Sequence, residues 1–251
     1  MIKYFIDFVP MGEIKDIDID YDNMKNIKDI KIAIKKNCKI PITFQELFEN
    51  DIMERKLDNN ELLSNLSTSF ELRMQKIALM SLSKLKFGVF QEFMLNNKLL
   101  PYKIQGNDTE TEQPFGIDTT YKCAQIRFDL DYAKKNNIRY LVSIENGIFR
   151  DDNGNIIDFC ATILFDTKTG LKYTNKDNLE KTFIYIKNGE KYFNLIKDGE
   201  ANTGLGFTKT IGSLLAKDFK VPKNNWMKKL NNFPRERQMY IALKSMFEII
   251  Y

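Results

Sequence analysis

The segment YLVSIENGI, residues 140–148, places a glutamate directly after an apolar run and directly before Asn-Gly. Isoleucine, valine and tyrosine favour a β-strand, and Asn-Gly is a strong signal for a tight turn. The sequence therefore predicts a buried strand that ends at Glu145, followed by a turn at Asn146 and Gly147. A carboxylate in that place serves either as a structural hydrogen-bond acceptor or as a ligand for a cation, and both interpretations are open.

The 251-residue chain contains no histidine. This excludes Ser–His and Cys–His nucleophile pairs, zinc sites built on histidine, and histidine general bases. Any acid–base or metal chemistry must therefore use carboxylates and lysines. Carboxylate oxygens suit hard cations, above all Mg²⁺, which proteins usually bind through one or two carboxylates together with phosphates of the substrate.

A group of hydroxyls and ammonium groups follows the apolar segment at residues 76–80, in the sequence MSLSKLKFGVF. Ser81, Ser83 and Lys86 lie where a predicted strand turns into a predicted helix over residues 85–95. The N-terminus of a helix has unpaired N–H groups and a partial positive charge, so it favours phosphate. The alternative is that the serines cap the helix and the lysines cover its surface.

The segment QPFGIDTTYKCAQIR, residues 113–127, predicts a loop that leads into another helix. Asp118 or Thr119 is expected to cap this helix, and Arg127 lies two turns after Thr120. The polar groups suit an anion or a metal ion. A capped helix with a surface arginine is the other interpretation.

The elements that would position these residues alternate between strand and helix from residue 76 onward. Strands are expected at 76–80, 140–145, 156–165 and 182–187, and helices at 85–95, from 118 or 119, at 208–219 and at 235–249. This pattern predicts an α/β fold, with a mixed central sheet flanked by helices and antiparallel hairpins within the sheet.

Residues 1–72 differ from the rest of the chain. Their patterns predict strands at 2–9 and 29–34 and helices at 44–57 and 60–72. We interpret them as an added N-terminal α+β region of unknown role, which precedes a domain formed by residues 73–251.

Taken together, three segments resemble the inosine/xanthosine triphosphatase family, which shares the ITP pyrophosphatase-like fold. KIALMSLSKLKFGVFQEFM resembles its strand, (S/T)TNPxK and helix; QPFGIDTTYKCAQIR resembles its QPFG, ET, GA and arginine pattern; YLVSIENGI resembles its strand ending IE-x-G. GLGFTKTIGSLLAK and NFPRERQMYIAL resemble later family segments. The likeness covers about residues 75–250, and most of its weight rests on QPFG and IENG.

The resemblance implies Mg²⁺-dependent hydrolysis of purine nucleoside triphosphates such as ITP and XTP, which removes them from the nucleotide pool, with Mn²⁺ as an alternative metal. It assigns catalysis and metal binding to Glu145 and Asp118. The residues that it assigns to substrate binding are Ser81, Ser83, Lys86, Thr120, Arg127 and Arg235. A cytoplasmic homodimer is typical of the family.

The sequence also departs from the family pattern. Thr119 stands where the family has the glutamate of its ET pair, and Lys209 and Thr210 replace an acid expected before the later Ile-Gly. Ser83 and Lys84 replace its Asn-Pro. A second interpretation is therefore open, in which the chain is a catalytically degenerate member that binds a nucleotide or a protein partner without turnover.

The composition is that of an ordinary globular protein, with 43% hydrophobic and 29% charged residues. No segment approaches the roughly 20 apolar residues of a membrane helix, so we expect no membrane partner. Three widely spaced cysteines favour a reducing cytoplasm over a disulfide framework. The net charge of +4 is spread along the chain, and only WMKKLNNFPRER combines aromatic and basic residues, so nucleic acid is the least supported partner.

Overall fold

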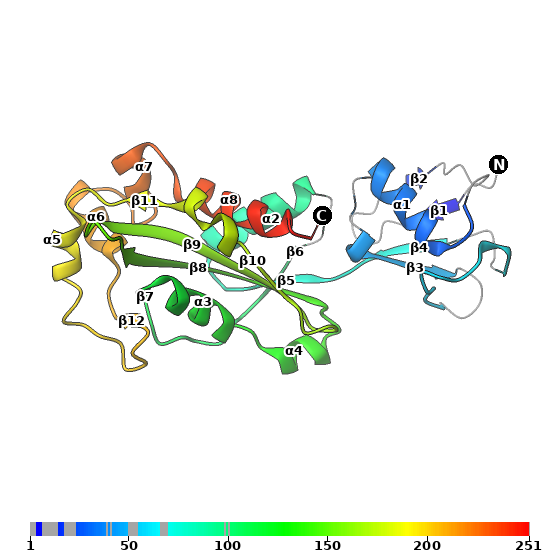
Figure 1. Ribbon diagram of the computed structural model, residues 1–251, viewed down its shortest axis with the longest axis horizontal. Coiled ribbons are helices and arrows are strands. Elements are labelled where there is room, and N and C mark those ends of the chain that lie inside the picture. Colours follow the sequence, from blue (N-terminus) through cyan, green and yellow to red (C-terminus); the bar gives the residue numbers. More distant parts are fainter. Residues whose placement is uncertain are drawn as a thin grey trace. The chain divides into compact units, whose positions relative to one another are not determined.

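The structure is a computed structural model that describes residues 4–6, 15–17, 24–38, 40, 42–49, 55–65, 70–97, 99 and 101–250. The chain divides into two compact units (Figure 1), one comprising Met1–Lys76 and Met94–Leu100, the other Ile77–Phe93 and Pro101–Tyr251. The division at Lys76 lies near the boundary at about residue 72 that the sequence pattern suggests. No helix in the described part of the chain is long and apolar enough to span a membrane.

The described residues among Met1–Lys76 form two antiparallel strand pairs and one helix. The elements are β1 (Tyr4–Ile6) paired with β2 (Lys15–Ile17), β3 (Gln45–Glu49) paired with β4 (Phe70–Met74), α1 (Ile27–Cys38), and 3₁₀ turns at Ile42–Phe44 and Leu63–Asn65. β1 lies within the strand expected at residues 2–9, and the other residues of that expected strand lie outside the described residues.

The strand expected at residues 29–34 is wrong, because these residues belong to α1. Ile27, Ile30 and Ile34 are all buried, and their spacing places them on one face of a helix. Two reciprocal hydrogen bonds cap the start of α1. Asn26 Oδ1 accepts from the backbone N–H of Asp29, and Asp29 Oδ2 accepts from the backbone N–H of Asn26, each at 3.1 Å. This capping arrangement satisfies N–H groups that a strand would have used in a sheet.

The helices expected at 44–57 and 60–72 are also wrong in the parts that the structure describes. β3 pairs with β4 residue by residue, with Leu47 opposite Leu72. The spacing of Phe44, Leu47 and Phe48 fits a helix as well as a strand, so long-range pairing decides between the two.

The second unit is built on a six-stranded mixed sheet. Its strands are β5 (Ile77–Met80), β6 (Pro101–Ile104), β8 (Tyr140–Arg150), β9 (Ile156–Asp166), β10 (Lys172–Thr174) and β11 (Ile184–Tyr185). The order is β10-β9-β8-β5-β6, with β11 also paired to β9. β5 is parallel to β6 and β8, while β8 and β9 form a long antiparallel hairpin. The predicted α/β fold with a mixed central sheet is confirmed.

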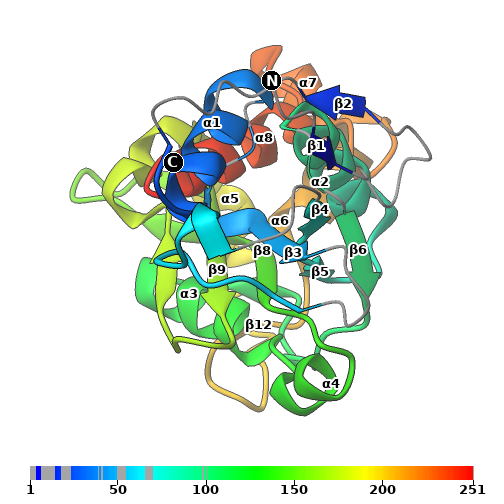
Figure 2. The ribbon, with the colours of Figure 1, turned by 90° about the vertical axis from the view of Figure 1, so that its right-hand side faces the viewer.

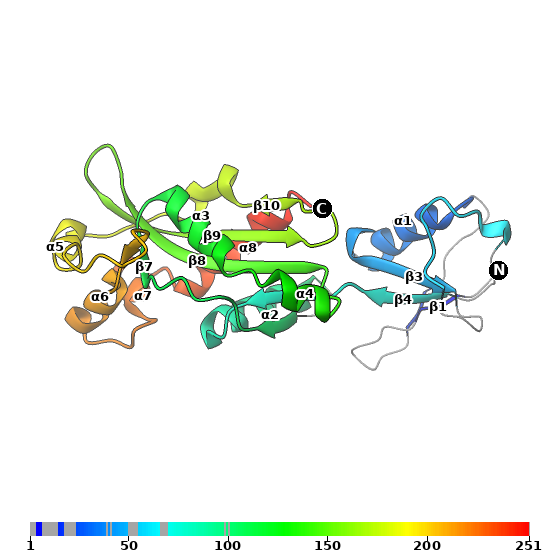
Figure 3. The same ribbon diagram turned by 90° about the horizontal axis from the view of Figure 1, so that it is seen from below.

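Helices cover both faces of this sheet. They are α2 (Lys84–Asn96), α3 (Ile117–Ile126), α4 (Leu130–Lys135), α5 (Gly189–Asn194), α6 (Ile211–Phe219), α7 (Trp226–Asn231) and α8 (Arg235–Phe247), with a 3₁₀ segment at Lys176–Thr182 and a small pair of β7 (Gln113–Pro114) with β12 (Gly206–Phe207). α3 and α8 lie on opposite faces of β8 and β9 (Figure 2), and Figure 3 shows α3 and α4 in front of the sheet. On the α8 face, the rings of Phe93 and Phe247 join α2 to α8 at 5.0 Å between centroids.

The turn expected at Asn146 and Gly147 is wrong. β8 continues through these residues to Arg150 and keeps its register, with Asn146 opposite Cys160 on β9. The turn lies instead at the next Asn-Gly in the sequence, where Gly154 has φ +80° and Asp151 Oδ1 accepts from the backbone N–H of Asn155 at 2.7 Å. Pairing with β9 over the whole length of β8 therefore overrides the first turn signal.

Gly147 is required by close packing between α3 and β8. A Cβ atom placed on Gly147 would lie 1.9 Å from Thr120 Oγ1 and 2.9 Å from Thr120 Cβ. Thr120 is fully buried, and its hydroxyl donates to the carbonyl of Gly116 at 2.8 Å. Gly116, with φ +97°, is the N-cap of α3 in place of the expected Asp118 or Thr119, and its N–H donates to the carbonyl of Ile148 at 2.8 Å.

Substituting Gly147 by alanine is expected to lower the free energy of unfolding by about 1–3 kcal/mol, because the new methyl group overlaps the Thr120 side chain. In a Thr120→Ala background the same change should cost less. Urea denaturation of the four proteins measures the coupling. An equal loss in both backgrounds would contradict the proposed contact.

Candidate functional site

A cavity of about 630 Å³ lies beside β8, at the point where its neighbour β5 ends. β5 pairs with β8 only as far as Leu79 opposite Val142, whereas β8 continues to Arg150. After β5 the chain enters α2 on one face, while β8 is preceded by α3 and α4 on the other (Figure 1). Ligand sites in α/β sheets commonly form at such a divergence, beyond the carboxyl ends of parallel strands.

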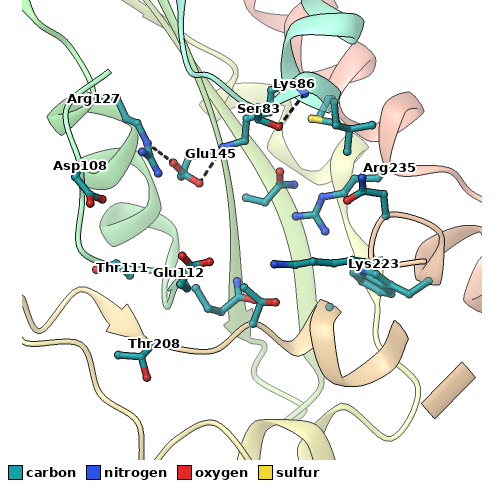
Figure 4. A pocket seen from close by; sticks show the side chains of 18 of the residues that line it. Ser83, Lys86, Asp108, Thr111, Glu112, Arg127, Glu145, Thr208, Lys223 and Arg235 are labelled. Carbon is teal, nitrogen blue, oxygen red and sulfur yellow. Dashed lines mark hydrogen bonds and ion pairs between the residues drawn. The ribbon is translucent and has the colours of Figure 1, made fainter. Parts of the chain in front are cut away.

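Charged side chains of both signs line this cavity. The cations are Lys86, Arg127, Lys223 and Arg235, and the carboxylates are Asp108, Glu110, Glu112 and Glu145. Figure 4 shows Glu145 between Arg127 and Lys86, with Lys223 and Arg235 on the opposite side of the cavity from Arg127. Such a set of groups suits a ligand that carries several negative charges and a bound cation.

Glu145 is the most deeply buried of these charges, at 6% exposure. Its Oε1 accepts from Lys86 Nζ at 3.1 Å, and its Oε2 accepts from Arg127 Nε at 2.8 Å. The side chains of Lys86 and Arg127 are themselves only 17% and 23% exposed. Burial alone would raise the pKa of Glu145, but the two cations outweigh it and lower the pKa below its ordinary value.

The start of α2 borders the cavity through Ser83 and Lys86. Ser83 Oγ accepts from the backbone N–H of Lys86 at 3.3 Å, and Ser81 Oγ accepts from the backbone N–H of Ser83 at 3.2 Å. Both serines therefore use an oxygen lone pair to cap the turn and the helix. Ser81 is not among the residues that line the cavity, whereas Ser83 is.

The opposite end of the cavity is formed by α7 and α8. Arg235 begins α8, lies 3.9 Å from the buried carboxylate of Asp158, and has its guanidinium 6.0 Å from the ring of Trp226. Trp226 and Met239 are buried and line the cavity. Gly212 brings α6 close to this ring, since an added Cβ would lie 2.6 Å from Trp226 Nε1. This end combines apolar surface with two cations, Arg235 and Lys223.

Besides Ser81, two more of the expected residues do not line the cavity. The Asp118 side chain is 88% exposed and accepts from Lys176 Nζ at 2.8 Å. Thr120 is buried against Gly147. Neither lines the cavity. Asp118 follows the first residue of α3 and lies on the solvent side of that helix, so the role expected for it beside Glu145 has no support in the geometry.

Several lining residues were not anticipated from the sequence. Glu112 stands immediately before QPFG, in the polar segment GNDTETE, and the clustering of acids there is the only signal that pointed to it. The sequence pattern places Asn146 in a turn and gives no sign that it lines a cavity. Lys223 lies in a stretch without a recognisable motif, and Trp226 begins WMKKLNNFPRER, whose aromatic and basic residues point only to a nucleic-acid partner.

No group of three or more carboxylates, cysteines or histidines in the described part of the chain is arranged to hold a metal ion. A magnesium ion would therefore need one or two of the lining carboxylates together with oxygens of the ligand, which is the usual arrangement for this ion. Glu145 and Glu112 have the donor chemistry for it. Glu145 would first have to loosen its ion pairs to Lys86 and Arg127.

Comparisons with known proteins give a structural match without a function. No protein-family model matches the sequence, and a search of curated proteins finds no match. Among solved structures, the chain is similar to the crystal structure of protein VC0702 from Vibrio cholerae, with 14% identity over 70% of this chain and 94% of that chain, at a TM-score of 0.49.

Substituting Glu145 by glutamine is expected to lower the free energy of unfolding by about 1–3 kcal/mol at pH 7, because Lys86 and Arg127 lose a charged partner but keep partial access to water. The pKa of Glu145 is lowered in the folded protein, so its ionised carboxylate stabilises the fold at pH values above 4.5, the ordinary pKa of this group. This contribution is lost as the pH falls through the lowered pKa. Urea denaturation from pH 7 down to pH 3 should show that the difference in free energy of unfolding between the wild type and the Glu145→Gln variant becomes smaller. A constant difference would contradict the ion pairs.

Proposed function

We propose that this protein binds a purine nucleoside triphosphate in the cavity beside β8 and hydrolyses it with Mg²⁺. The supporting observation is that Lys86, Arg127, Glu145 and Arg235, which are distant in the sequence, line one cavity. The family resemblance had assigned all four to the site. The cavity of about 630 Å³ also has the size of a small-molecule site.

Binding of the triphosphate would use the cationic end of the cavity. Lys86 and Arg127 are bound to Glu145 in the free protein, and phosphate oxygens would compete for both. The start of α2 adds its partial positive charge. As these cations turn to the phosphates, the carboxylate of Glu145 becomes available to a divalent ion.

Glu145 is the buried carboxylate that would hold Mg²⁺ together with phosphate oxygens. The bound ion would neutralise the charge on the phosphate oxygens and on the leaving group. Within the described residues, the side chain of Glu112 is exposed and makes no hydrogen bond or ion pair, so it is suited to accept a proton from the attacking water. The oxygen of that water bonds to phosphorus, a phosphoanhydride bond breaks, and phosphate or pyrophosphate leaves.

The second candidate function is nucleotide binding without turnover. It is favoured by the position of Asp118, which is exposed and paired with Lys176 rather than facing Glu145. Thr119 and Lys209, in place of the acids of the resembled family, point the same way. In that case Glu145 would serve only to order Lys86 and Arg127 for an anionic ligand.

A product-release assay separates the two functions. Phosphate and pyrophosphate are measured with ITP, XTP, dITP, GTP and ATP, each with Mg²⁺, Mn²⁺ or EDTA. We expect metal-dependent turnover that Glu145→Gln lowers by about 100-fold or more, because the metal and the phosphates lose their buried ligand and organiser. Absence of turnover from folded protein would leave only the binding function.

The matched control for this assay is Asp166→Asn. Asp166 is also a buried carboxylate of the same sheet, paired with Arg139 at 3.1 Å, but it does not line the cavity. Its substitution should affect stability and leave turnover per folded molecule unchanged. Equal losses in the Asp166 and Glu145 variants would show that the Glu145 effect is structural.

Asp118→Asn is expected to leave turnover within about twofold of the wild type, since exposed ion pairs contribute little and this one lies outside the cavity. The same release assay measures it. A loss as large as that of Glu145→Gln would return Asp118 to the metal site that the family resemblance implies.

A cytoplasmic location and a homodimeric state are part of the same proposal. Both come from the family resemblance, and the location is also supported by the odd number of widely spaced cysteines. The proposed substrates, free purine nucleoside triphosphates, are present in the cytoplasm.

A further inference from the structure

Lys223 stands in a tight turn that connects α6 to α7. The backbone N–H of Val221 donates to the carbonyl of Ala216 at 3.0 Å and closes the end of α6, and the backbone N–H of Asn225 donates to the carbonyl of Pro222 at 2.8 Å. Lys223 is therefore the second residue of a hydrogen-bonded turn, and the proline before it restricts the backbone further. The backbone at Lys223 is thus fixed on both sides, while its side chain is exposed.

The turn directs the side chain of Lys223 into the cavity. Trp226 begins α7 directly after the turn and anchors it, since this side chain is only 1% exposed. Figure 4 shows Lys223 pointing into the cavity beside Arg235, on the opposite side from Arg127. A ligand that enters the cavity from solvent can therefore reach the ammonium group of Lys223 without any change in the protein core.

The charge of Lys223 is the least neutralised among the cations that line the cavity. Lys86 and Arg127 both bind the same buried carboxylate, at 3.1 and 2.8 Å. Arg235 lies 3.9 Å from Asp158, which is an ion pair but is longer than a hydrogen bond. Lys223 makes no hydrogen bond or ion pair with any residue that the structure describes. An anionic group in the cavity would therefore meet a free cation on this side.

The phosphate group that most needs a free cation is the one that departs. Negative charge accumulates on the departing group as its phosphoanhydride bond breaks, and cations placed at that group stabilise it. The γ-phosphate belongs to the departing group whether phosphate or pyrophosphate leaves. Lys86 and Arg127 flank Glu145, where the metal ion would bind. The cation that remains for the departing group is Lys223, on the opposite wall.

We infer that Lys223 donates a charge-assisted hydrogen bond to the γ-phosphate, and thereby makes the cavity select nucleoside triphosphates over diphosphates and monophosphates. This inference rests on the proposed function, because it takes the ligand to be a nucleoside triphosphate. Arg235 lies beside Lys223 and adds a second positive charge at the same group. The nucleotide that remains after hydrolysis lacks the γ-phosphate, so it loses this contact and is released more readily.

The test is isothermal titration calorimetry with ITP, IDP and IMP in EDTA, so that metal-dependent hydrolysis does not consume the ligand. Lys223→Met removes the charge and keeps a side chain of similar length. We expect this variant to bind ITP about 10- to 100-fold more weakly than the wild type does, which is the usual contribution of one charge-assisted hydrogen bond. Its affinity for IDP and IMP should stay within about threefold of the wild type, and Lys223→Arg should restore most of the affinity for ITP.

Lys228→Met is the matched control. Lys228 lies on α7, two residues after Trp226, and is exposed like Lys223, but it does not line the cavity. Its substitution removes the same charge from the same part of the protein and should leave the affinity for ITP within about twofold of the wild type. Because both lysines are exposed, both variants are expected to fold, and equal midpoints of urea denaturation check this.

Several results would overturn the inference. If Lys223→Met weakens ITP, IDP and IMP by the same factor, the lysine does not contact the γ-phosphate. A loss in Lys228→Met as large as that in Lys223→Met would show a general effect of net charge in place of a contact. If the wild type and Lys223→Met bind ITP equally tightly, the inference fails while the proposed nucleotide site stands. If the wild type binds none of the three nucleotides, the proposed function fails together with the inference.

Discussion

The buried carboxylate of Glu145 is the charge around which the site is organised. It is satisfied by one cation from the start of α2 and one from the end of α3, so the three elements meet at a single group. Removing a charge from water is costly unless it is paired, and both of its oxygens are occupied here. The same pairs hold Lys86 and Arg127 at the cavity, where an anionic ligand would find them already ordered.

The unequal lengths of β5 and β8 create the space that these charges surround. β8 extends beyond the last residue paired with β5, so its edge is open to the cavity over Glu145 and Asn146. Neighbouring residues of a strand point to opposite faces, yet both border the cavity because it lies along the edge and not over one face. The cavity is therefore bordered by charged side chains around Glu145 and by the apolar side chains of Trp226 and Met239.

Local patterns predicted the α/β part of the fold correctly where they were long and bounded by loops. The strand at 76–80 and the helices at 85–95, 208–219 and 235–249 correspond to β5, α2, α6 and α8, with differences of a few residues at their ends. The predictions failed where one spacing fits two structures: Ile27, Ile30 and Ile34 form a helix face, and Gln45–Glu49 form part of a strand pair. In these short segments the distant partner decides, and its identity is not a local property.

The sequence by itself determined the kind of chemistry available and several of its residues. Without histidine, the site had to use carboxylates and cations, and Glu145, Lys86, Arg127 and Arg235 were identified from their motifs. Only the tertiary structure decided that these four share a cavity while Asp118 turns to solvent, because a helix places adjacent residues on different sides. It also decided that the residues after Glu145 continue the strand, since eleven residues of β8 pair with β9 and the hydrogen bonds of that ladder outweigh a local turn preference.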